Sequence, residues 1–109
     1  MPATWDDFER LQLVVGTITQ VDDFPDARQP AYKLVIDVGP LGTRVSSAQI
    51  THYSKAALVG RQVICVLGFA PKRIAGFKSE VLVTGALSDQ LGVVLLKPDA
   101  TVEPGTPVG

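Results

Sequence analysis

The fold is decided by the stretch Leu13-Val14-Val15-Gly16-Thr17-Ile18-Thr19-Gln20-Val21-Asp22-Asp23-Phe24. Residues of even number, such as Val14 and Ile18, face one way, and residues of odd number, such as Val15, face the other. This period of two predicts a long β-strand. A glycine inside a strand is typical of a bulge or a bend, so we expect the strand to bend at Gly16.

More strands and one short helix follow along the chain. Alternating or apolar runs bounded by turn residues predict strands at Tyr32–Val38, Thr43–Ile50, Arg61–Phe69, Glu80–Leu87 and Gly92–Lys97, and a helical turn at Ser54–Val59. Three strands, a short helix and two further strands are the order of an OB-fold. The predicted fold class is therefore all-β, a five-stranded Greek-key barrel with its helix between strands three and four. An SH3-like barrel remains the alternative on pattern alone.

Two elements flank this barrel. Thr4 and Asp7 have the spacing of a helix N-cap and its third residue, and Trp5, Phe8 and Leu11 form an apolar stripe behind them. A helix of about two turns is marginal alone, so it needs something to pack on. The proline-rich segment 98–109 is predicted to be extended. These two elements either seal the barrel or form a symmetric interface between two copies.

Composition limits the classes of function. The 109 residues suit one domain, 1–109, and 46% hydrophobic against 19% charged residues indicate a folded chain. A net charge of −1 excludes a domain-wide basic field, so any anion site must be local. The first ten residues lack the apolar core of a signal peptide, and no apolar run is long enough to span a bilayer. We expect a cytoplasmic protein without membrane insertion.

The most informative polar segment is Pro71–Leu82. Lys72, Arg73 and Lys78 lie close together there, with Phe77 and Ser79 between or beside them. This mixture suits a loop that binds a polyanion or an extended chain. The alternative is a solvated connection with its aromatic ring tucked into the barrel mouth.

Two further observations bear on this surface. Arg28, Lys33 and Arg44 extend the basic patch if the first hairpins lie beside it. A second polar stretch, 44–51, carries serines and a glutamine; we interpret it as a packed strand, with a ligand surface as the alternative.

The sequence contains few residues that could form a catalytic site. His52 is the only histidine, and the only cysteine, Cys65, lies within an apolar strand. The sequence therefore does not indicate a Cys–His pair, a His-based triad or a transition-metal site, and no phosphate-binding glycine loop is present. We predict a protein that is not an enzyme and that has no cofactor and no metal.

Several motifs occurring in order carry a family resemblance. The chain resembles the tRNA-binding-domain family, which includes modules appended to aminoacyl-tRNA synthetases, and within it the free-standing branch of CsaA secretion chaperones. The motifs cover almost the whole chain: Phe8–Leu11, Val15–Ile18, Phe24–Arg28, Leu34–Asp37, Ser46–Thr51, Gly60–Val63 and Pro71–Glu80.

The resemblance implies partners and sites. It implies an OB-fold whose N-terminal helix, through Trp5, Phe8 and Leu11, and C-terminal extension build a homodimer. It implies binding of tRNA, for which we expect Lys72, Arg73, Lys78, Ser79, Leu82 and Arg44. It also implies binding of unfolded preproteins, for which we expect Phe69, Ile74 and Phe77, and of the export motor SecA.

Two positions depart from the family pattern. Leu82 stands in place of a methionine and Gly68 in place of an asparagine, which lowers the tRNA affinity we expect. Two hypotheses follow. In the first, the protein is a chaperone for export that also binds tRNA; in the second, it is primarily a structure-specific tRNA-binding protein without an export role.

Overall fold

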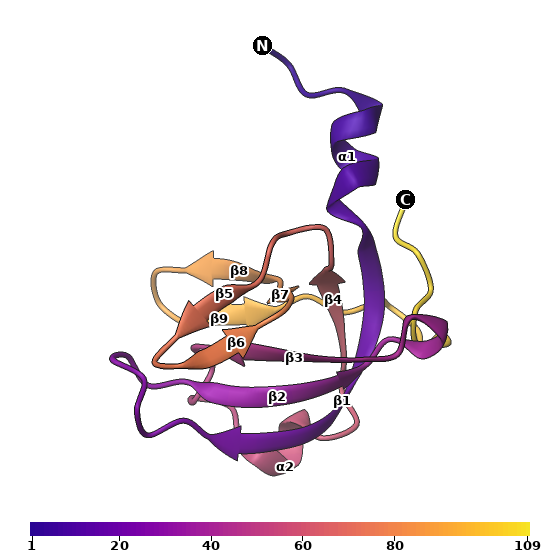
Figure 1. The fold of residues 1–109 in the computed structure, drawn as a ribbon. Coiled ribbons are helices and arrows are strands. Elements are labelled where there is room, and N and C mark those ends of the chain that lie inside the picture. Colours follow the sequence, from indigo (N-terminus) through magenta and orange to yellow (C-terminus); the bar gives the residue numbers. More distant parts are fainter.

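Five antiparallel strands form a curled sheet that closes nearly into a barrel in the computed structural model, which describes residues 1–109 (Figure 1). The strand order β3-β2-β1-β4-β7 and the short helix α2, Lys55–Leu58, between β3 and β4 confirm the predicted OB-fold. The barrel strands are β1 Leu13–Asp23, β2 Tyr32–Asp37, β3 Thr43–Ala48, β4 Gln62–Val66 and β7 Leu82–Val83.

Two small hairpins and two further helical elements complete the chain. The basic segment, expected as a loop, forms a hairpin of its own from β5, Lys72–Ile74, and β6, Phe77–Ser79. The remaining elements are the helix α1 Trp5–Leu11, the 3-10 turn η1 Gly39–Leu41, and the hairpin of β8 Gly85–Ser88 and β9 Gly92–Leu95. None of the helices has the length or the apolar content needed to cross a membrane.

The strand expected at Glu80–Leu87 is split in two. The last backbone hydrogen bond to β4 runs from the Thr84 N–H to the Ile64 carbonyl oxygen, at 3.0 Å. The chain then turns to β9, where a Cβ at Gly85 would lie only 2.5 Å from Val93 Cγ1. Only glycine allows β9 to come this close. From Gly85 onward the chain therefore pairs with β9 in a separate hairpin.

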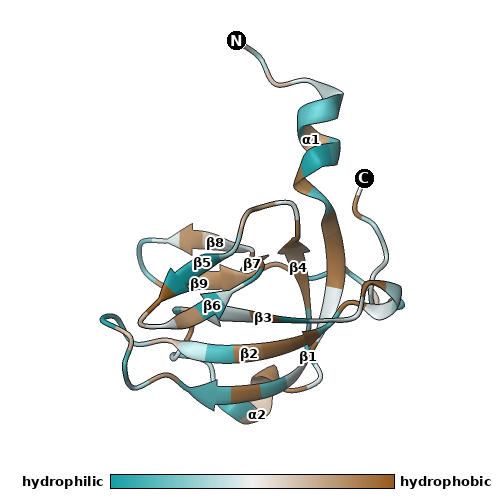
Figure 2. Ribbon diagram, viewed as in Figure 1, coloured by the Kyte–Doolittle hydropathy of each residue, from teal (hydrophilic) through white to brown (hydrophobic).

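The core follows the predicted alternation. In β2 the side chains of Leu34 and Ile36 are fully buried, as the period of two requires. Figure 2 shows hydrophobic residues along much of β1, β2 and β4. The predicted bend lies elsewhere than expected: the bulge of β1 falls between Ile18 and Gln20. Gly16 instead makes room for the core, since a Cβ there would lie 2.5 Å from Ile36 Cγ2. Burial raises the pKa of the Cys65 thiol to about 12, so this cysteine is an inert part of the core.

The C-terminal tail runs along the outer edge of β1 as the predicted extended segment. The Val15 N–H donates to Thr106 and the Val108 N–H donates to Leu13, each at 2.9 Å. The buried Gln62 side chain fixes the tail further along, because its amide donates to the Val102 carbonyl at 2.7 Å and accepts from the Val102 N–H at 3.1 Å. The tail therefore belongs to the barrel wall.

The helix α1 is capped as predicted but projects from the barrel (Figure 1). The Thr4 hydroxyl accepts the Asp7 N–H, and the Asp7 carboxylate accepts the Thr4 N–H. That bond from the Thr4 backbone, together with a hydrogen bond from Arg10, lowers the pKa of Asp7. No residue of α1 is buried, and Trp5 keeps 84% of its surface exposed.

Candidate peptide and nucleic-acid binding cleft

A basic cleft lies between the loop that joins β1 to β2 and the β5–β6 hairpin. Its volume is about 660 Å³. One wall is the loop, the other is β5 with its turn, and residues of β3 and its C-terminal end lie between them. The residues of this basic cleft that the argument uses are Asp26, Arg28, Ser47, Gln49, Lys72, Arg73 and Ile74.

An aromatic contact holds the hairpin over β2. The Phe77 ring meets the Phe24 ring edge to face, with 5.5 Å between the ring centroids. The Lys33 ammonium lies 4.7 Å from the centre of Phe24 and 5.2 Å from that of Phe77. Cation–π contacts of this kind contribute about 0.5–1 kcal/mol at exposed sites. The Phe77 ring, which the sequence analysis expects as a peptide contact, thus ties the hairpin to the β1–β2 loop.

The base of the hairpin is joined to β3 by hydrogen bonds. The Ser79 hydroxyl accepts the Ser47 N–H at 3.0 Å, and the side chain of Ser79 is buried. The Glu80 carboxylate accepts the Val45 N–H at 3.0 Å, while the Glu80 N–H donates to the Val45 carbonyl at 2.9 Å. These bonds close the barrel and fix the hairpin at its base.

The tip of the hairpin is a tight two-residue turn. Ala75 and Gly76 both have positive φ, at 48° and 81°. This is the conformation of a type I′ turn, whose twist matches that of paired strands. The turn keeps β5 and β6 in register, with Lys72 opposite Ser79 and Arg73 opposite Lys78.

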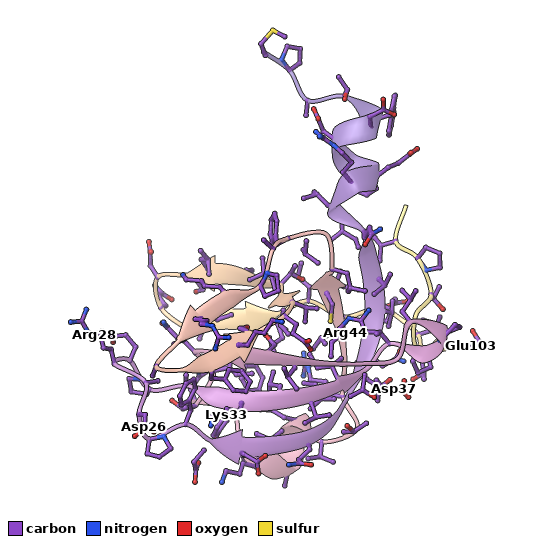
Figure 3. All side chains as sticks on the ribbon, viewed as in Figure 1. Asp26, Arg28, Lys33, Asp37, Arg44 and Glu103 are labelled. Atoms are coloured by element: carbon purple, nitrogen blue, oxygen red, sulfur yellow. The ribbon has the colours of Figure 1, made fainter.

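Positive charge gathers at the basic cleft, although the chain as a whole is slightly acidic. Arg28, Lys72 and Arg73 line it against one carboxylate, Asp26. Figure 3 shows Asp26 and Arg28 on the β1–β2 loop and Lys33 between that loop and the hairpin. A local excess of cations draws acidic groups, whether carboxylates or phosphates, and Ile74 adds an apolar contact.

The other predicted tRNA-binding residues lie apart from the basic cleft. Lys78 is exposed on β6, and Leu82 is exposed on β7. The Arg44 guanidinium donates to the Leu41 carbonyl at 2.7 Å and lies well away from Arg28 (Figure 3). Phe69, a predicted peptide contact, is half exposed in the segment after β4. The roles of these residues remain predictions.

Ser47 and Gln49 join the site from a stretch that the sequence analysis interpreted as a packed strand. Ser46 does pack inward, and its hydroxyl donates to the Val81 carbonyl at 2.8 Å. Ser47 and Gln49 instead line the basic cleft. The available signal is the period of two, which sets Ser47 and Gln49 on the face opposite to Ser46 and Ile50.

A second groove lies between α1 and the C-terminal tail. Its volume is about 690 Å³, and it is mostly apolar. It lies away from the basic cleft, and Arg44 borders it. The residues of this helix–tail groove include Trp5, Phe8, Leu13, Leu41, Leu67, Pro107 and Val108.

Comparison with known proteins matches both the sequence and the fold. The model of the family described as "Putative tRNA binding domain" matches residues 13–107. The solved structure of the CsaA chaperone from Picrophilus torridus has a TM-score of 0.93 and 47% identity, covering 99% of this chain and 100% of that one. The CsaA chaperone from Bacillus anthracis gives a TM-score of 0.92 and 46% identity, with both chains covered completely.

Relatives also occur inside a much larger enzyme. The methionine–tRNA ligase of Methanosphaerula palustris is 30% identical over 103 residues, which cover 94% of this chain. The chain spans only 15% of the length of that ligase. The similarity therefore concerns one module of the ligase.

Proposed function

The chain belongs to the tRNA-binding-domain family, and from this membership we propose that it is a chaperone that holds extended segments of unfolded preproteins and also binds tRNA. The observation that carries the proposal is the basic cleft of about 660 Å³, which Arg28, Lys72 and Arg73 line. The similarity to CsaA chaperones favours the chaperone over the alternative of a dedicated tRNA-binding protein. The family is defined by binding, so we propose no catalytic activity.

The chemistry of the basic cleft suits both ligands. Its cations neutralise carboxylates of an acidic peptide segment or phosphates of a tRNA backbone, and neither contact reads sequence. An extended chain also gains an apolar contact at Ile74. By the same resemblance we propose that the protein works in the cytoplasm and passes its clients to SecA.

We test the chaperone proposal by the aggregation of a chemically unfolded preprotein, followed by light scattering. The native chain is expected to suppress the scattering, and the pair Lys72→Ala with Arg73→Ala is expected to lose most of that effect. Both side chains are exposed, so their removal leaves the barrel intact. The control pair, Lys55→Ala with Lys97→Ala, removes the same charge elsewhere and is expected to behave as the native chain does. Equal suppression by both pairs would contradict the proposal.

We propose that the protein is a homodimer in which a second copy covers the helix–tail groove. The support is the exposed apolar face of α1, because a helix of seven residues is unstable in water without packing. Phe8 and the tail residues Pro107 and Val108 border this groove. A two-fold arrangement would present two basic clefts to one large ligand and so raise its effective affinity.

The dimer predicts a signal from Trp5, which is the only tryptophan. Its emission is expected to shift to shorter wavelength as the concentration rises, because association removes the indole from water. Sedimentation is expected to give about twice the 11.6 kDa of one chain. Trp5→Glu is expected to give a monomer, whereas Leu87→Glu, at another exposed apolar position, leaves the dimer intact. A native chain that sediments as a monomer at all concentrations would refute the dimer.

A further inference from the structure

The outer edge of β3 is covered only over part of its length. β3 is the terminal strand of the five-stranded sheet, so one of its edges has no partner strand. The N–H groups of Val45 and Ser47 point to this edge and donate to the side chains of Glu80 and Ser79. Side chains thus take the place of a neighbouring strand as far as Ser47.

Beyond the Ser47 N–H, the backbone groups on this edge of β3 lack good hydrogen-bond partners within the chain. The N–H and C=O of one residue point to the same side of a strand, so the Ser47 carbonyl also faces the edge. Its one side-chain contact is the Ser46 hydroxyl at 3.5 Å, which is long for a hydrogen bond. Gln49 follows directly after β3, and continuing the alternation of the strand by one residue directs its N–H to the same edge; this N–H has no acceptor within the chain. Gln49 is exposed to solvent.

These two groups form one free step of a β-ladder beside the cations. A carbonyl on one residue and an N–H two residues later are what an added strand requires of its neighbour. Both Ser47 and Gln49 line the basic cleft, and Arg28, Lys72 and Arg73 line it with them. The edge therefore offers backbone bonds where acidic side chains are favoured.

We propose that an extended, acidic polypeptide segment adds to β3 as a short extra strand, donating an N–H to the Ser47 carbonyl and accepting the Gln49 N–H. The inference rests on the proposed chaperone function and specifies how the client is held. Strand addition at a free sheet edge draws affinity from the main chain, and neighbouring pockets select side chains. A binding mode of this kind accepts many sequences, which suits a chaperone with varied clients.

The strand geometry specifies which client residues matter. Successive side chains of a strand point to opposite sides, so every second side chain of the client faces the cations of the hairpin and loop. Acidic residues at alternate positions are therefore preferred. A nucleic-acid backbone does not present the N–H and C=O groups of a β-strand, so it cannot extend the ladder at Ser47 and Gln49 as a peptide does, even though both ligands use the cations.

The test uses the full-length protein labelled with nitrogen-15 and a capped peptide of about seven residues that alternates glutamate with valine. Saturating peptide is expected to slow hydrogen exchange of the Gln49 N–H about tenfold or more. N-methylation of the one peptide amide that donates to the Ser47 carbonyl is expected to weaken binding about tenfold, and N-methylation of the amides on either side of it is expected to have little effect. The peptide in which lysine replaces glutamate is expected not to bind.

Variants of the protein provide matched controls. Gln49→Pro removes the N–H donor and is expected to lose the peptide, while Gln49→Ala keeps the donor and the affinity. Because proline can disturb β3 itself, the N-methylated peptides test the same bond on the unaltered protein.

Three results would overturn strand addition. The first is peptide binding that shifts the resonances of Arg28, Lys72 and Arg73 without protecting the Gln49 N–H; it leaves the chaperone proposal standing. The second is N-methylation that weakens binding equally at every peptide amide. The third is no binding of the acidic peptide by a protein that still suppresses aggregation.

Discussion

Replacing Lys72 and Arg73 with alanine is expected to weaken the binding of total tRNA about a hundredfold at about 50 mM salt. The two side chains are exposed cations on β5 and border the basic cleft. Each phosphate contact that is lost lowers the slope of log affinity against log salt by about one, so the slope is expected to fall by about two. A mobility-shift titration at two salt concentrations measures both quantities.

The control separates a local site from a general effect of charge. The pair Lys55→Ala with Lys97→Ala changes the net charge equally but lies outside the basic cleft, and it is expected to leave the slope nearly unchanged. Lys78→Ala tests whether the outer face of β6 also contributes. If the native chain shifts no tRNA at low salt while it still suppresses aggregation, tRNA binding is wrong and the chaperone function stands.

The two ligands share cations, which makes their competition informative. The charge of the chain is −1, yet Arg28, Lys72 and Arg73 all line one cleft. A tRNA and an acidic client are therefore expected to exclude each other from that cleft. Binding of one ligand would then release the other, and the balance between them would depend on salt more steeply for tRNA.

The barrel could be predicted from the sequence because its signals are local. The alternation of buried Leu34 and Ile36 with less buried residues lies within one strand, and the cap of α1 lies within four residues, from Thr4 to Asp7. Both features depend on neighbours along the chain. They were therefore visible without knowledge of the tertiary structure.

The form of the basic segment could not be predicted in this way. It folds as a hairpin because Phe77 packs on Phe24 beneath Lys33, and because Ser79 and Glu80 bond to β3. These partners lie far away in the sequence. Its charge was evident, but its shape and the cleft beside it depend on tertiary contacts.

Gly68, which stands where the family has an asparagine, is also explained only by contacts in the tertiary structure. On sequence alone, a glycine in place of the asparagine of the family predicts a lower affinity for tRNA. In the structure, a Cβ at Gly68 would overlap the Arg10 carbonyl oxygen, and the Gly68 N–H donates to the Leu11 carbonyl at 2.9 Å. The glycine is therefore explained by the packing of the end of α1 against the segment after β4.

Photo-crosslinking tests most directly whether the basic cleft holds unfolded clients. Benzoylphenylalanine placed at Ile74, inside the basic cleft, is expected to crosslink an unfolded preprotein at least about tenfold more than the same group at Leu87. Leu87 is the stringent control, because it is apolar and 83% exposed, whereas Ile74 is only partly exposed. Client that collects on exposed apolar surface would favour Leu87. Preferential crosslinking at Ile74 would support the account, and equal or stronger crosslinking at Leu87 would contradict it.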